Sequence, residues 1–280
     1  MGKLSLISIF ILICVLIAQT CAIAPLDSSL VFIHGEGGYY CHKIPYLLRT
    51  MSNVLIAFAE GRGKYGRTAC DDYAGTDLVY KRSFDNGLTW SPLQVFFSNS
   101  TESTSHVIGN AAPVQDQKTG RIWTPFCEDN EIVYMTYSDD DGETWAPPVL
   151  QPQLVRPTWK WVGLGPPGGI QLSTGRLLIP GYHTTLIKGN GLASKGHTIY
   201  SDDGGRVWRM GSADFGSPYL LNECQAVELK NGSVLINART LVSRRVQIIS
   251  DDGGLTFGNA YVVPGIVEPM EGISLSMSFV

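Results

Sequence analysis

The chain has little charge, and its charge is not concentrated anywhere. Of its 280 residues, 16% are charged, and the formal net charge is −4 without any run of Lys or Arg. Nucleic-acid binding needs a basic patch or stripe, so no nucleic-acid partner is expected. The sequence also lacks a Gly-Lys-Ser/Thr phosphate loop, and its five histidines show no metal-ligand spacing. We therefore expect neither a metal nor a cofactor.

Cysteines are few, and none of the six forms a Cys-x-x-Cys pair. Two of them fall in residues 1–24, where Lys3, an apolar stretch from Leu4 to Ala18 and small residues at Ala22 and Ala24 form the pattern of a cleaved signal peptide. A retained N-terminal anchor is the alternative. The other four cysteines either pair as disulfides in the secretory pathway or remain buried thiols.

The rest of the chain alternates between short apolar runs and turn residues. Its 31 glycines and 15 prolines fall between stretches rich in Val, Ile, Leu, Tyr and Trp. Many short strands with frequent turns predict an all-β fold: a sandwich, a barrel or a propeller.

An eight-residue pattern, Ser-x-Asp-x-Gly-x-Thr-Trp, recurs four times. Val207 replaces Thr in the third copy, and Phe257 replaces Trp in the fourth. The copies begin at Ser83, Ser138, Ser201 and Ser250. Their starts lie about 50 to 65 residues apart, which is room for four short strands with their loops, or one propeller blade.

This repeat is predicted to build turns and to carry no chemistry. An Asp side chain can accept hydrogen bonds from nearby backbone N–H groups, and Gly can adopt the positive φ that a tight turn requires. The closing Trp or Phe is expected to bury its ring between blades. The spacing lacks the twelfth-position Glu of a calcium-binding EF-hand loop. We therefore interpret the repeated aspartates as structural.

The repeat resembles the Asp box of sialidases, and further segments are similar to that family in the same order along the chain. They are residues 42–46 (His-Lys-Ile-Pro-Tyr), 57–62 (Ala-Phe-Ala-Glu-Gly-Arg), 109–113 (Gly-Asn-Ala-Ala-Pro), 222–225 (Asn-Glu-Cys-Gln) and 236–239 (Ile-Asn-Ala-Arg). The resemblance runs from about residue 33 to the end and is strongest to the animal lysosomal sialidases. It implies a six-bladed β-propeller over residues 25–280, with about four to five blades present and the fold incomplete at the C-terminus.

The resemblance also implies an activity: exo-α-sialidase, hydrolysing terminal sialic acid from glycoproteins, oligosaccharides or gangliosides with retention. In this family the nucleophile is a Tyr, because the sugar's own carboxylate would repel a carboxylate nucleophile. Glu223 matches the Glu that acts as base for this Tyr. Asp72 matches the loop Asp that protonates the leaving oxygen, and Asp71 is the alternative. The Tyr itself and a third arginine are expected beyond Val280.

The substrate carboxylate is bound in this family by three arginines, whose planar guanidinium groups suit bidentate recognition. Arg239 matches the second of them, and Arg62 matches a further arginine of the sugar pocket. Tyr182 matches an aromatic residue beside that pocket, and Trp161 either contacts glycan or belongs to the core. Lys43 stands where the first arginine is expected, and it keeps the charge but loses the bidentate geometry.

Lys43 also keeps a second hypothesis open, a non-catalytic propeller that binds sialylated glycans. A third hypothesis is an Asp-box propeller that binds proteins. The signal peptide is compatible with secretion or with lysosomal delivery, and the resemblance favours the lysosome. An association there with a protein partner or with the membrane is left open.

Overall fold

The computed structural model describes residues 28–268, apart from residues 66–68, 102 and 188–190. The chain divides into two compact units, Met1–Leu30 and Val31–Val280. The signal peptide expected at residues 1–24 lies outside the described residues and stays a prediction. Within the described ranges, no helix is long and apolar enough to cross a membrane.

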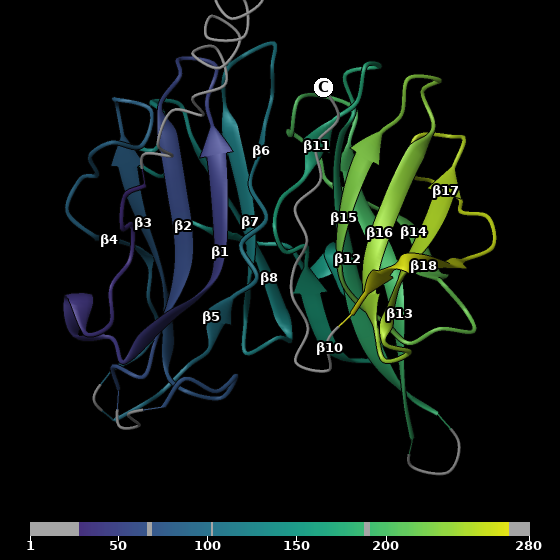
Figure 1. Ribbon diagram of the computed structural model, residues 1–280, viewed down its shortest axis with the longest axis horizontal. Coiled ribbons are helices and arrows are strands. Elements are labelled where there is room, and N and C mark those ends of the chain that lie inside the picture. The colour runs from purple at the N-terminus through teal and green to yellow at the C-terminus, as the bar shows by residue number, and fades with distance from the viewer. Residues whose placement is uncertain (1–27, 66–68, 102, 188–190, 269–280) are drawn as a thin grey trace, which may run out of the picture. The chain divides into compact units, whose positions relative to one another are not determined.

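The unit Val31–Val280 contains four antiparallel sheets that follow one another along the chain (Figure 1). The first sheet contains β1 (Cys41–Arg49), β2 (Leu55–Arg62), β3 (Thr76–Ser83) and β4 (Gln94–Phe97). The second contains β5 (Ile108–Gly109), β6 (Val114–Gln115), β7 (Ile122–Glu128), β8 (Ile132–Ser138) and β9 (Val149–Leu150). The third contains β10 (Trp159–Leu164), β11 (Ile170–Gln171), β12 (Leu177–Ile187), β13 (Gly191–Ser201) and β14 (Arg209–Phe215). The fourth contains β15 (Leu221–Glu228), β16 (Val234–Thr240), β17 (Arg244–Ser250) and β18 (Tyr261–Val267).

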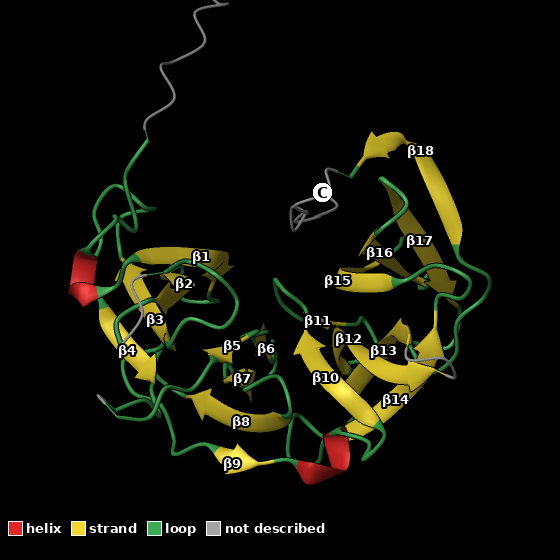
Figure 2. Cartoon of the chain, turned by 90° about the horizontal axis from the view of Figure 1, so that it is seen from below, coloured by secondary structure: helices red, strands yellow, loops and turns green. Residues whose placement is uncertain are grey.

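Each sheet is one propeller blade. Strands that follow one another in the chain pair in the order β1-β2-β3-β4, and the other three sheets repeat this order, with β6 and β11 as short extra strands. In Figure 2 the first strand of each sheet faces the middle of this unit, and β4, β9, β14 and β18 lie on the outside. Two short 3₁₀ helices, η1 (Glu36–Gly38) and η2 (Pro152–Leu154), complete the described elements. The all-β propeller predicted from the sequence is confirmed, with four blades in the described residues.

The four Asp boxes join the third strand of each blade to the fourth. In the first copy, Gly87 N donates to Ser83 Oγ at 2.8 Å, and Thr89 N and Oγ1 donate to the Asp85 carboxylate at 2.9 and 2.6 Å. The hydrogen bond from the Thr89 hydroxyl is the main cause that lowers the pKa of Asp85 to about 2. Asp140, Asp203 and Asp252 accept equivalent backbone hydrogen bonds. These carboxylates therefore hold turns, as the sequence predicts.

The aromatic ring that ends an Asp box packs against the preceding blade in the second, third and fourth copies. Trp145 contacts Phe96 with ring centroids 4.6 Å apart, and Trp208 contacts Trp123 at 6.3 Å. Phe257 contacts Phe215 at 4.3 Å. These rings join core clusters that extend from one blade into the next.

A similar hydrogen bond recurs at three junctions between neighbouring blades. At each one, a backbone N–H in a hairpin turn of one blade donates to a side chain of the blade that follows. Gln115 Oε1 accepts from Met51 N at 2.9 Å, Gln171 Oε1 accepts from Gln117 N at 2.6 Å, and Glu228 Oε2 accepts from Ser173 N at 2.8 Å. Each acceptor is the last residue of β6, β11 or β15. Neighbouring blades are therefore fixed by polar contacts as well as by apolar packing.

Candidate active site

A pocket of about 480 Å³ is lined by residues from all four blades. The sequence predicted six catalytic or substrate-binding residues, and every one of them lines it: Lys43, Arg62, Asp72, Tyr182, Glu223 and Arg239. The other lining residues are Ile44, Glu60, Val107, Gly109, Asn110, Asn130, Trp161, Thr184 and Asn222. Asp71, the alternative to Asp72, is not among the residues that line the pocket.

The pocket lies at the end of the sheets opposite to the Asp boxes. In the first blade, Ser83 begins the Asp box and pairs with Leu55 at one end of β2, whereas Arg62 ends β2 beside Thr76. In the fourth blade, Ser250 pairs with Val234, and Arg239 lies toward the other end of β16. The turn-building residues and the candidate chemical residues are thus separated by the length of the strands.

Irregularities in the first strands of the blades place side chains in the pocket. In β1, Lys43 pairs with Glu60 and Tyr46 with Phe58, so β1 contains one extra residue, which is a β-bulge. Ile44 lies within this bulge at φ 51°, an uncommon value for a β-branched residue. The strain coincides with the segment that carries Lys43.

The fourth blade has a corresponding bulge. In β15, Leu221 pairs with Thr240 and Cys224 with Ala238, so Asn222 and Glu223 lie in a segment with one extra residue. Both of these residues line the pocket. Glu228, farther along β15, bonds instead to Ser173 of the third blade.

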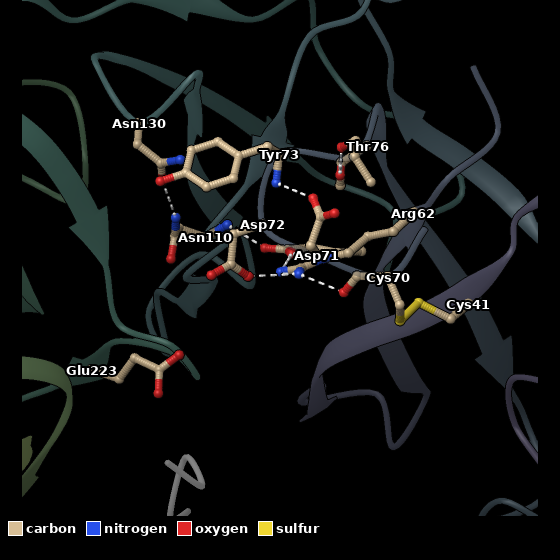
Figure 3. A network of polar contacts seen from close by, with 12 residues as sticks. Cys41, Arg62, Cys70, Asp71, Asp72, Tyr73, Thr76, Asn110, Asn130 and Glu223 are labelled. Atoms are coloured by element: carbon tan, nitrogen blue, oxygen red, sulfur yellow. Dashed lines mark hydrogen bonds and ion pairs between the residues drawn. A yellow bond between two sulfur atoms is a disulfide. The ribbon is translucent and has the colours of Figure 1, made fainter. Parts of the chain in front are cut away.

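Arg62 is the centre of a charged network on the first blade (Figure 3). Glu60 Oε2 accepts hydrogen bonds from Arg62 Nε at 3.0 Å and Nη2 at 2.6 Å. Arg62 Nη1 donates to Asp72 Oδ1 at 2.7 Å. The Arg62 side chain is 6% exposed, and that of Asp72 is 67% exposed. The guanidinium therefore joins a buried carboxylate to one at the mouth of the pocket.

Glu60 was given no role by sequence reasoning, yet it holds Arg62 in place. Its Oε1 accepts from Asn110 N at 2.9 Å, which links the first blade to the second. Burial raises the pKa of Glu60, and the charge of Arg62 acts against that rise. Burial on its own would lower the pKa of Arg62. The Glu60 and Asp72 carboxylates outweigh burial, so the pKa is raised and the guanidinium stays charged. Glu60 and Arg62 are two residues apart on one strand, so their side chains point to the same face. That spacing could have identified Glu60 from the sequence.

The loop that carries Asp72 is anchored at several points. A disulfide joins Cys70 to Cys41 at the start of β1, and Arg62 Nη1 also donates to Cys70 O at 3.4 Å. Gly63 N donates to Gly75 O at 2.9 Å, which closes the base of the loop. The sequence left disulfides and buried thiols open, and both occur, because Cys127 and Cys224 are buried free thiols.

On the fourth blade, Arg239 and Glu223 form an ion pair. Arg239 Nη1 donates to Glu223 Oε2 at 3.2 Å, and the two side chains are 23% and 12% exposed. Figure 3 shows Glu223 across from Asp72, on a separate part of the chain. The pocket therefore brings together two carboxylates from the first and fourth blades. Asp72 is paired with Arg62, and Glu223 is paired with Arg239.

The third blade supplies an aromatic wall. Trp161 Nε1 donates to the hydroxyl of Tyr182 at 3.2 Å. Burial, followed by the nearby charge of Glu223, raises the pKa of Tyr182, so its phenol stays protonated. A Cβ atom added at Gly163 would lie 2.4 Å from the Tyr182 ring, so only Gly allows the ring this position. Trp161 belongs to the pocket, whereas Trp159 is buried in the core.

One group of described residues has the composition of a metal site. The ligand atoms of His106, Glu128 and Asp129 lie within 4.8 Å of one another. His106 Nδ1 and Asp129 Oδ2 are 2.8 Å apart, and this hydrogen bond raises the pKa of His106. Asp129 Oδ1 also accepts from Val107 N at 2.8 Å. Hydrogen bonds and ion pairs account for this group, and we assign it no metal.

Comparison with known proteins identifies the family. Residues 53–276 match the BNR repeat-like domain family. Sialidase-2 of Rattus norvegicus is 30% identical over 284 residues, covering 91% of this chain and 71% of the rat protein. Sialidase of Micromonospora viridifaciens is 27% identical over 272 residues, covering 88% of this chain but 40% of that protein. The exo-alpha-sialidase of Aspergillus fumigatus is 30% identical over 187 residues, covering 54% of this chain and 43% of the fungal protein.

Solved structures agree with this assignment. The Hadza microbial sialidase Hz136 superposes with a TM-score of 0.68 at 25% identity, over 79% of this chain and 46% of that chain. The intramolecular trans-sialidase of Ruminococcus gnavus superposes with a TM-score of 0.73 at 18% identity, over 88% of this chain and 76% of that chain. The second likeness shows the fold alone. With the matched domain and the related sequences, these findings establish that the chain belongs to the sialidase family of BNR-repeat propellers.

Proposed function

We propose that the chain acts on terminal sialic acid of glycans as an exo-α-sialidase. The observation that carries this proposal is the convergence of Arg62, Asp72, Glu223 and Arg239 in one pocket. A propeller that only binds proteins has no need to bring two ion-paired carboxylates together in this way. The relatives named sialidase or exo-alpha-sialidase support the same activity.

Sialic acid carries a carboxylate on its anomeric carbon, and the pocket presents cations to it. Arg239 supplies a guanidinium that can bind a carboxylate through two N–H groups. Lys43 supplies an exposed ammonium from the β1 bulge. Arg62 is held by Glu60 and Asp72, so in our proposal it orders the site more than it binds the substrate carboxylate.

The two carboxylates take different roles in the proposed reaction. Asp72, at the mouth, gives its proton to the departing glycosidic oxygen as the bond to the anomeric carbon breaks. The nucleophilic Tyr that the resemblance leads us to expect beyond Val280 attacks that carbon, and Glu223 takes the phenolic proton. Water then attacks the glycosyl–Tyr intermediate, Asp72 takes a proton from the water, and Glu223 returns one to Tyr. Because burial keeps the Tyr182 phenol protonated, we assign Tyr182 to sugar contact and not to attack.

The proposal is tested on a protein extended to include the expected Tyr, by the release of sialic acid from 3′-sialyllactose at acidic pH. Asp72→Ala and Glu223→Gln should each reduce kcat by about 10²- to 10⁴-fold, because each removes a proton-transfer group. Glu228→Gln serves as the matched control, since Glu228 lies on the same strand as Glu223 without lining the pocket, and Asp71→Ala tests the alternative acid. Full activity in the Asp72 and Glu223 variants would contradict these roles.

A second result distinguishes the enzyme from a glycan-binding propeller. Binding of 3′-sialyllactose without turnover in the folded protein that includes the expected Tyr would favour the non-catalytic hypothesis. The absence of both binding and turnover would overturn the proposed function altogether.

We also propose that the chain enters the secretory pathway, with the lysosome as the favoured destination. The Cys41–Cys70 disulfide supports this route, because disulfides persist in oxidising compartments and are rare in the cytosol. Mass spectrometry of the protein from expressing cells tests the proposal. A mature chain that begins near residue 25 is expected, and a chain that retains residues 1–24 would contradict cleavage.

A further inference from the structure

An exposed aromatic side chain lies directly beside the proposed acid. Tyr73 follows Asp72 in the sequence and is 73% exposed. In Figure 3 the Tyr73 ring extends toward Asn130, and the Asp72 carboxylate points toward Glu223. Tyr73 does not line the pocket, so the ring lies outside it, next to the mouth.

The backbone that presents this ring is well anchored. Tyr73 N donates to Asp71 Oδ1 at 2.9 Å, and Ala74 N donates to Asp71 O at 3.3 Å. The Cys41–Cys70 disulfide and the Arg62–Asp72 ion pair hold Cys70 and Asp72, which precede Tyr73 by three residues and by one. A side chain on such a turn is presented in a defined position, which lowers the entropic cost of using it for binding.

The chemistry of the reaction places the leaving group on this side of the site. A general acid must lie within hydrogen-bond reach of the oxygen that it protonates, and that oxygen belongs to the leaving group. The sugar next to sialic acid must therefore extend from the pocket past Asp72. Tyr73 is the next residue along the loop after Asp72, and its side chain is exposed.

We propose that Tyr73 forms a leaving-group subsite, in which its ring stacks against the C–H face of the pyranose next to sialic acid. This inference rests on the proposed function and names the part of the glycan that the site selects. Tyr offers a large, rigid, amphipathic surface at low conformational cost, which suits a sugar that is polar at its rim and apolar on one face. The subsite favours glycan-linked sialic acid over sialic acid on a small alkyl group.

The test compares two ligands that share the sialic acid. Dissociation constants are measured by calorimetry for 3′-sialyllactose and for methyl α-sialoside, with Glu223→Gln present in every protein compared so that turnover does not consume the ligand. The protein that keeps Tyr73 should bind 3′-sialyllactose about three- to tenfold more tightly, a difference in the range of a single ring contact. Tyr73→Ala should abolish this preference without changing the affinity for methyl α-sialoside.

Two further variants separate stacking from loop structure. Tyr73→Phe keeps the ring and should keep the preference. Phe84→Ala removes another exposed ring, 68% exposed, from the first Asp box at the far end of the sheet, and should change neither affinity.

Each outcome has a distinct meaning. If Tyr73→Ala retains the wild-type preference, the subsite is wrong while the proposed function stands. If Tyr73→Ala weakens both ligands equally, the residue supports the loop and the subsite is also wrong. If the protein that keeps Tyr73 binds neither ligand, the proposed function fails and this inference fails with it.

Discussion

Lys43 stands where the resemblance to sialidases leads us to expect an arginine. It lies at a β-bulge in β1, the strand of the first blade that faces the middle of the propeller, beside Ile44 in a strained conformation. The bulge thus brings a cation to the pocket even though that cation is not an arginine. A lysine contributes charge there without the two parallel N–H groups of a guanidinium.

This difference predicts the effect of restoring the arginine. Lys43→Arg should bind methyl α-sialoside about three- to tenfold more tightly, because a bidentate contact replaces a point charge. Lys43→Ala should bind it more weakly than wild type. Calorimetric titration of the three proteins provides the comparison. An alanine variant with wild-type affinity would show that Lys43 takes no part in binding.

At the scale of the element, the Asp-box hairpin is the unit that builds the fold. Its glycine does more than permit the turn, because it also lies against the neighbouring blade. Gly205 has φ +88°, and a Cβ atom added there would lie 2.0 Å from Trp123 Nε1. Trp123 Nε1 donates to Gly204 O at 3.0 Å, so the indole has little freedom to move away.

Gly205→Ala should therefore destabilise the protein by about 2–4 kcal/mol, through backbone strain together with overpacking. Gly232→Ala is the matched control, because Gly232 has φ +85° with nothing within 4 Å of the added Cβ. Strain alone should cost about 1–2 kcal/mol at that position. Urea unfolding of both variants measures the two free energies. Equal losses would contradict the interblade contact.

The sequence predicted some local elements of the fold and missed others. The Asp boxes were recognisable because each one is local, with its donors and acceptors within a few residues. The bulges at Lys43–Tyr46 and Leu221–Cys224 were not, since a bulge appears only when two strands are paired. The spacing of Glu60 from Arg62 was visible in the sequence, but its contact with Asn110 of the second blade was not.

At the scale of the whole molecule, the site exists because four blades are assembled. Lys43, Arg62 and Asp72 come from the first blade, Tyr182 from the third, and Glu223 and Arg239 from the fourth. Repeated hydrogen bonds, such as Gln117 N to Gln171 Oε1, set each blade against the next. The site residues could be named in advance through resemblance, but only the assembled propeller shows that they share one pocket.

In our proposal, this shared pocket recognises the carboxylate of sialic acid. The most direct test compares the affinity of the full chain for methyl α-sialoside with its affinity for the corresponding C1 carboxamide, which lacks the negative charge. Charge-assisted hydrogen bonds are worth about 1.5–3 kcal/mol, so the carboxamide should bind at least about tenfold more weakly. Arg239→Ala should remove most of that difference. Equal affinity of the wild-type chain for the two ligands would contradict the account.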